Sequence, residues 1–103
     1  MRITKRFKQL VLLGAAMFLV AACDHAELSG ETLAQEKGCV ACHGSNGVAS
    51  VAIYPNLSGQ WDRYLRLQLR AYRSGKRENS IMQGMAANLT DAEISALAEH
   101  YGR

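Results

Sequence analysis

The chain has 103 residues, of which 49% are hydrophobic and 20% are charged, and its formal net charge is +3. This length allows one small domain, and the apolar fraction excludes a disordered chain. A single proline and nine glycines exclude collagen-like and linker-like compositions. The three cysteines are an awkward number for a disulfide framework, in which cysteines occur in pairs.

The first segment, residues 1–22, has the pattern of an export signal. Four basic residues come before the first acidic residue, and residues 10–22 form an uncharged run of thirteen residues. A transmembrane helix needs roughly twenty apolar residues, so this run is short for a membrane span. A basic start followed by a short apolar run that ends in small residues is typical of a secretory signal peptide.

The end of this segment, Val-Ala-Ala followed by Cys23, resembles the bacterial lipobox. In such signals cleavage follows acylation of the thiol, so we predict that Cys23 carries lipid and begins the mature chain. Ordinary cleavage nearby, or an uncleaved anchor, is the alternative. Asp24 would favour the inner membrane if the source sorts lipoproteins as enterobacteria do. The predicted organisation is a signal at 1–22, a linker at 23–29 and a domain at 30–103. Without the signal the net charge is −1, so nucleic acid is not expected as a partner.

A short helix and a haem-attachment motif follow the linker. Ser29 can cap a helix over residues 30–37, and Gly38 ends it. The next five residues, Cys39-Val-Ala-Cys42-His43, form the C-x-x-C-H motif of covalent haem attachment. Two thiols three positions apart lie on one side of a helical turn, so both can reach the two vinyl groups of haem. His43 can then bind the iron as the proximal ligand.

Other uses of these cysteines fit the sequence less well. A zinc site needs four ligands, and neither a second C-x-x-C nor a histidine pair is present. A thioredoxin-like dithiol needs a βαβ scaffold, which the chain does not suggest. A disulfide between residues three apart would be strained and would leave His43 unexplained. No disulfide is therefore predicted.

A loop and the most amphipathic helix come next. Residues 44–60 are rich in Gly, Ser and Asn, so they are predicted to wrap as a loop, and their apolar part, 47–53, is expected to pack on the haem. In the helix predicted over 61–74, one side gathers Tyr64, Leu65, Leu69, Ala71 and Tyr72 and should face the core. The opposite side carries a row of arginines: Arg63, Arg66, Arg70, Arg73 and, if the row continues, Arg77. This row is interpreted as a solvated face or as a docking site for an acidic redox partner or anionic lipid.

The sixth iron ligand must come from the remaining histidines or methionines. His25 lies in the linker, and His100 is expected on the polar, solvent-facing side of the last helix. Met82 and Met85 lie about forty residues after the motif, and either could bind iron. The last helix begins at the capping box formed by Thr90 and Glu93. It continues with Ile94, Leu97, Ala98 and Tyr101 at helical spacing and stops at Gly102.

With these pieces the sequence, from about residue 30 to residue 101, resembles the class I cytochromes c, in particular small single-haem members of bacterial respiratory chains. The resemblance implies an all-α fold of about four short helices around one covalent haem c. It implies that Met82, eight residues before the threonine of the last helix, is the distal iron ligand, with Met85 as second choice. It also implies that the Pro55 carbonyl binds the His43 ring, and that the first and last helices cross near Gly30 and Tyr101.

The function that this resemblance implies is one-electron transfer by a His/Met-ligated haem, outside the cytoplasm and next to a membrane. Expected partners are redox proteins, with no small-molecule substrate, no catalytic residues and a monomeric chain. Two alternatives stay open: a haem-based gas-binding or sensor protein, and a haem subunit of a larger oxidoreductase. Carbon monoxide binding to the ferrous protein would favour the first alternative over the carrier.

Overall fold

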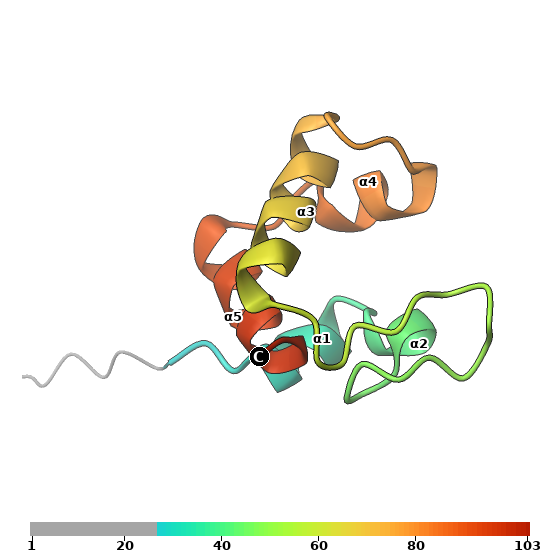
Figure 1. Cartoon of the computed structure of the whole chain (residues 1–103). Coiled ribbons are helices and arrows are strands. Elements are labelled where there is room, and N and C mark those ends of the chain that lie inside the picture. Colours follow the sequence, from blue (N-terminus) through green and yellow to red (C-terminus); the bar gives the residue numbers. More distant parts are fainter. Residues whose placement is uncertain (1–26) are drawn as a thin grey trace, which may run out of the picture.

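The computed structural model describes residues 27–103, which form five helices and no strand (Figure 1). The expectation of an all-α domain is therefore confirmed for the described part of the chain. None of the described helices is long and apolar enough to cross a membrane. The signal segment, Cys23 and His25 lie outside the described residues.

The first and last helices, α1 (Gly30–Glu36) and α5 (Asp91–Tyr101), pack against each other. Both begin where the sequence predicted: the Ser29 hydroxyl accepts from the Thr32 amide at 3.3 Å, and the Thr90 hydroxyl accepts from the Glu93 amide at 3.1 Å. At the crossing, a Cβ on Gly30 would overlap the Ala96 carbonyl, so only glycine allows this close approach.

The third helix, α3 (Asp62–Ser74), packs across α5 and begins one residue later than predicted. Its buried residue, Leu65, joins a core built mostly from α1 and α5: Leu33, Ala34, Ala86, Leu89, Ile94, Leu97, Ala98 and Tyr101. Tyr64 differs from the prediction, because it is 44% exposed and borders a cavity instead of packing into this core. The helix ends at Gly75, whose φ of 80° favours glycine.

Two further helices complete the fold. The single turn α2 (Val40–His43) contains the end of the C-x-x-C-H motif, as expected. The helix α4 (Ser80–Ala86) was not predicted, so the described residues form five helices where about four were expected. The residue that could have predicted this helix is Asn79, whose side chain accepts a hydrogen bond from the Met82 amide at 3.0 Å and caps the helix.

Residues 44–61 form the predicted wrapping loop, which closes on itself through its backbone. The amides of Leu57 and Ser58 donate to the Gly47 carbonyl, at 2.8 and 3.0 Å. Residues 47–53 were expected to pack on the haem. Ile53 borders a cavity, whereas Val48 and Val51 border none and are 57% and 49% exposed. The loop is held by these backbone hydrogen bonds and by Leu57, which packs against the core.

Candidate haem site

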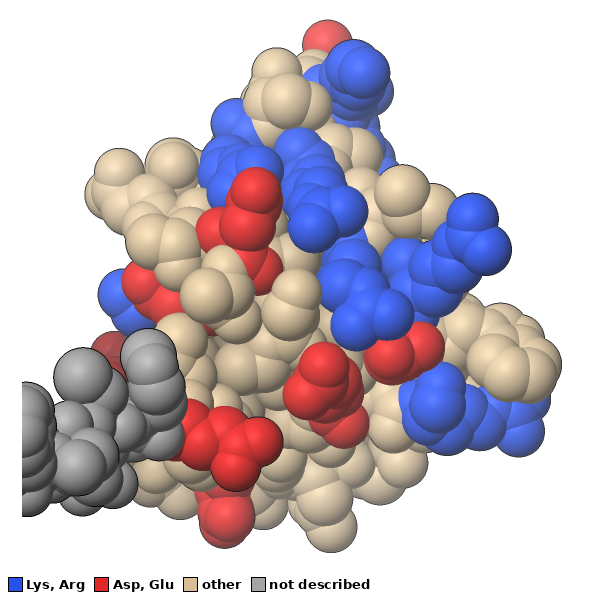
Figure 2. Space-filling view, turned by 90° about the vertical axis from the view of Figure 1, so that its left-hand side faces the viewer, with Lys and Arg blue, Asp and Glu red and all other residues tan. Residues whose placement is uncertain are grey.

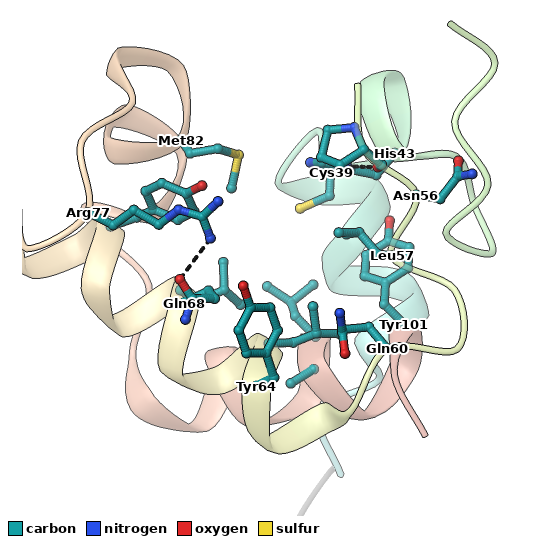
Figure 3. Close-up of a pocket in the computed structure, with 16 residues that line it drawn as sticks. Cys39, His43, Asn56, Leu57, Gln60, Tyr64, Gln68, Arg77, Met82 and Tyr101 are labelled. Carbon is teal, nitrogen blue, oxygen red and sulfur yellow. Dashed lines mark hydrogen bonds between the residues drawn. The ribbon is translucent and has the colours of Figure 1, made fainter. Parts of the chain in front are cut away.

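Two adjoining cavities of about 280 and 410 Å³ separate the C-x-x-C-H side of the molecule from α3 and α4. Figure 3 shows Met82 reaching into this space from one side, and Cys39 and His43 from the other. The two cavities share six of their lining residues: Cys39, His43, Pro55, Tyr72, Arg77 and Met82. The structure therefore brings the haem-attachment motif and Met82, 39 positions apart in the sequence, to one site.

Of the two cysteines of the motif, Cys39 directly precedes α2 as its N-cap residue and Cys42 is its third residue. Both thiols are free, and both border the cavities, with Cys42 lining only the second. Burial raises the pKa of the Cys39 thiol, so this group stays protonated at neutral pH. Two accessible thiols on one helical turn fit attachment to two vinyl groups.

The imidazole of His43 is buried, with 8% of the residue exposed, and its orientation is fixed by one hydrogen bond. Its Nδ1 atom lies 2.9 Å from the Pro55 carbonyl oxygen, which is the contact that the family resemblance implied. A carbonyl can only accept, so Nδ1 carries the proton and the lone pair of Nε2 is free for a metal. Such a partner for the far nitrogen is typical of metal-binding histidines.

The two candidate methionines differ in what they face. Met82 borders both cavities, and Figure 3 shows its thioether on the side opposite His43. Met85 is 39% exposed, borders only the second cavity and extends towards Gly38. The position of Met82 thus suits an axial ligand better than that of Met85.

His100, expected to face solvent, is half-buried, and it does not line either cavity. Its Nε2 atom lies 2.7 Å from the Ser45 carbonyl oxygen, and its ring packs edge-on against the Tyr101 ring. The Tyr101 hydroxyl in turn donates to the Gly44 carbonyl at 3.0 Å. The end of α5 therefore supports the backbone directly after the C-x-x-C-H motif.

Three arginines of the predicted row are engaged within the molecule. Arg66 contacts Asp62 at 2.9 Å and Glu99 at 3.8 Å, and Arg73 contacts Asp91 at 2.7 Å. Arg70 also approaches Asp91, at 3.8 Å. Figure 2 shows basic and acidic side chains side by side on this face. The row is therefore largely a charged seam between α3 and α5, and it offers less free positive charge than the sequence suggested.

Arg77 does not continue this row, because α3 ends at Ser74 before reaching it. Its guanidinium donates to the Gln68 side-chain oxygen at 2.7 Å and lies 4.8 Å from the centre of the Tyr72 ring. It borders both cavities, because the chain turns at Gly75 before reaching it and so leaves the direction of α3. Arg77 is the cationic residue that both cavities share.

Sequence reasoning missed the polar side chains on the floor of the first cavity. Gln60, Tyr64 and Gln68 line it at a spacing of four residues, which places them along one side of α3 and its approach (Figure 3). That four-residue spacing was the sequence pattern that could have revealed them. The pattern was hard to see because apolar residues of the same helix lie between these polar residues in the sequence.

The residues of this site fit a covalently bound haem c. Two thiols, an oriented imidazole and a thioether match the attachment points and axial ligands of such a group. The first cavity also has polar side chains that could bind the carboxylates of haem, namely those of Arg77, Gln60, Gln68 and Tyr64. Its apolar wall, which suits the haem ring, is formed by Leu57, Leu65, Leu69, Leu97 and Ala98. An all-helical domain with this site is a c-type haem protein.

Comparison with known proteins leads to the particular family. Residues 28–100 match the family described as Cytochrome c, and the chain belongs to it. The chain is 44% identical over 66 residues to cytochrome c-554(548) of Halomonas halodenitrificans, covering 61% of this chain and 80% of that protein. It is also 44% identical over 66 residues to a thiosulfate dehydrogenase electron acceptor of Thiomonas intermedia, covering 63% of this chain but 30% of that protein.

Solved structures agree with the fold. Reduced recombinant cytochrome c4 from Pseudomonas stutzeri superposes with a TM-score of 0.63 at 37% identity, covering 70% of this chain and 44% of that one. The cytochrome c4 of Acidithiobacillus ferrooxidans superposes with a TM-score of 0.64 at 29% identity and covers 45% of its chain. The protein is therefore a class I c-type cytochrome, with haem c as its cofactor. It spans less than half of the cytochrome c4 chains that it matches.

Proposed function

We propose that this cytochrome is a one-electron carrier whose haem iron is held by His43 and Met82. The observation that carries the proposal is the pair of groups facing the same cavities from two sides. One is an imidazole fixed through Nδ1 by the Pro55 carbonyl, and the other is the Met82 thioether. When bound, haem c supplies an iron that cycles between Fe(II) and Fe(III).

Each residue of the site has a limited task in this proposal. Cys39 and Cys42 hold the cofactor covalently, and the buried His43 ring keeps a fixed tautomer and direction. Met82 would be the second protein ligand of the iron, and a soft thioether ligand favours the reduced state and raises the reduction potential. A filled sixth position also excludes small ligands. Arg77 offers a positive charge to the carboxylates of the cofactor, and no residue needs to make or break a bond in a substrate.

The setting of this carrier is a further part of the proposal. Residues 1–22 would direct export, and lipid on Cys23 would tether residues 30–103 to a membrane on the periplasmic side through the linker 23–29. A tether raises the local concentration of the carrier near membrane redox enzymes. The Thiomonas relative is named an electron acceptor of thiosulfate dehydrogenase, which supports redox proteins as partners for this chain.

A ligand-binding experiment tests the proposed ligation. The reduced holoprotein is mixed with carbon monoxide at neutral pH, and its visible spectrum is followed. We expect little binding, because Met82 closes the sixth position, and the oxidised protein should show a thioether-to-iron charge-transfer band. Ready binding of carbon monoxide together with absence of that band would contradict the carrier and favour the gas-binding alternative.

Mass measurement tests the setting independently. Protein purified from its native membranes should have a mass equal to residues 23–103 plus one haem and acyl groups. An unmodified Cys23, or a different first residue, would refute the lipid anchor without affecting the proposed electron transfer.

A further inference from the structure

The helix that carries Met82 cannot hold its position by its own stability. Helix α4 has seven residues, whereas isolated helices shorter than about 12–15 residues are marginal in water. Met82 is its third residue, so movement of either end of α4 would move the thioether. The contacts that fix the two ends therefore decide where Met82 lies.

The beginning of α4 is fixed by local contacts. The Asn79 side chain caps the helix through the Met82 amide, and the Arg77 amide donates to the Ala71 carbonyl at 3.1 Å. The first bond closes the start of the helix, and the second fastens the segment before α4 to the end of α3. They leave the segment after α4 to be held by something else.

The end of α4 leads into residues 87–90, which return to the core at Leu89. The Leu89 side chain is buried, and its amide donates to the Ala86 carbonyl at 3.1 Å. Its carbonyl accepts a 3.0 Å hydrogen bond from Nη1 of Arg73, which extends from α3. Nη2 of the same guanidinium donates to the Asp91 carboxylate at 2.7 Å, two residues further on.

Arg73 thus joins α3 to two points of the connection between α4 and α5. One bond is partly buried, and the other is a charge-assisted bond to the first residue of α5. A guanidinium makes this double contact with one rigid plane, which a lysine cannot do. The neighbouring Arg66 has no such contact, since its partners are Asp62 and Glu99.

We propose that Arg73 is a positioning residue for the sixth iron ligand: by fastening the segment after α4 to α3, it keeps Met82 directed at the haem site. Without this clamp the segment at 87–90 is released from α3. Helix α4 then spends more time displaced, and the sixth position becomes open to outside ligands. The inference rests on the proposed ligation by Met82, and it assigns Arg73 a role other than docking.

Imidazole binding to the oxidised holoprotein tests this role, because imidazole binds only when the sixth position is open. We expect Arg73→Gln to raise the imidazole affinity about tenfold, in line with the loss of a charge-assisted hydrogen bond. Arg73→Lys should recover part of the difference, and Asp91→Asn should raise the affinity only about twofold to threefold, because the bond to Leu89 remains. The thioether-to-iron band should weaken in the same order.

Arg66→Gln is the matched control, since it removes an ion-pairing arginine from the same helix without touching residues 86–91. It should leave the imidazole affinity unchanged. An affinity of Arg73→Gln equal to that of the wild type would overturn the proposal. If Arg73→Gln does not accumulate as holoprotein, Asp91→Asn takes its place, and an imidazole affinity equal to that of the wild type would overturn the proposal.

The Met82→Ala variant separates failure of this inference from failure of the ligation itself. If Met82→Ala raises the imidazole affinity while Arg73→Gln does not, only the role of Arg73 is refuted. If Met82→Ala leaves the affinity unchanged, Met82 is not the ligand, and both proposals fall.

Discussion

The two sides of the haem site are built in different ways. On one side, Cys39, Cys42 and His43 lie within five consecutive residues on a single helical turn, and one bond to Pro55 orients the imidazole. On the other side, Met82 lies on a seven-residue helix whose ends are fastened by Asn79 and Arg73.

This difference separates the attachment of the haem from the placement of its methionine ligand. The spacing of the motif and the geometry of a helical turn bring the two thiols and His43 together, and Pro55 and the end of α5 add contacts to this side. The methionine side depends on contacts between distant segments, so substitutions far from the cavity can alter it. We therefore expect the cofactor to remain bound in many variants whose sixth ligand is disturbed.

The largest effect should come from breaking the attachment side. In a Cys39→Ala, Cys42→Ala double variant no thiol of the described domain remains to form a thioether, so no haem should be bound covalently. The intact mass of the purified protein measures this directly. Cys23→Ser is the control: it should keep the haem and lose any lipid, and a loss of haem there would contradict the separate roles of the cysteines.

Removing the ligand on the methionine side should leave the haem attached but change its potential. We expect Met82→Ala to lower the reduction potential by a part of the roughly 0.8 V range that axial ligands control. Electrochemical titration of the holoprotein measures the change. Met85→Ala is the matched control, with only a small expected shift because Met85 is 39% exposed and borders one cavity. A larger shift in reduction potential for Met85→Ala than for Met82→Ala would identify Met85, and not Met82, as the iron ligand.

The crossing of α1 and α5, which supports the attachment side, can be tested through glycine. A Cβ at Gly30 would overlap the Ala96 carbonyl and lie 2.6 Å from the His100 Cβ, so Gly30→Ala should destabilise the fold by about 2–3 kcal/mol. Gly84 of α4 has nothing within 4 Å of such a Cβ, so Gly84→Ala should stabilise by about 0.5–1 kcal/mol. Denaturant unfolding measures the free energy of unfolding of both variant holoproteins. Equal changes in that free energy would refute the close packing at Gly30.

The smallest effect concerns the hydroxyl of Tyr101. Tyr101→Phe removes its bond to the Gly44 carbonyl and should cost about 1 kcal/mol of unfolding free energy at neutral pH. Burial raises the pKa of Tyr101 to about 12, so the neutral phenol stabilises the folded state below pH 10. That contribution is lost as the pH rises from 10 towards 12, because the unfolded chain ionises first. Stability measured across this range should fall less steeply for the phenylalanine variant than for the wild type.

Several parts of the fold were predictable because they depend on neighbouring residues. Ser29 and Thr90 begin helices through their own hydroxyls, and Gly75 ends α3 through its positive φ. Helix α4 was missed because its cap, Asn79, precedes only seven helical residues with no strong periodic pattern. Short helices of this kind form through packing, which a local pattern does not reveal.

The sequence by itself determined the attachment chemistry, since the distance between two thiols three positions apart is a property of any helical turn. It also determined the helix starts, because capping bonds span three residues. Only the tertiary structure decided the direction of Arg77 and the partners of Arg66 and Arg73. Those contacts join α3 to α5 and to the segments before and after α4, and their geometry depends on how the helices pack. Helical spacing places the arginines on one face of α3, but which acidic residues they meet depends on how α5 packs against that helix through its buried apolar side chains.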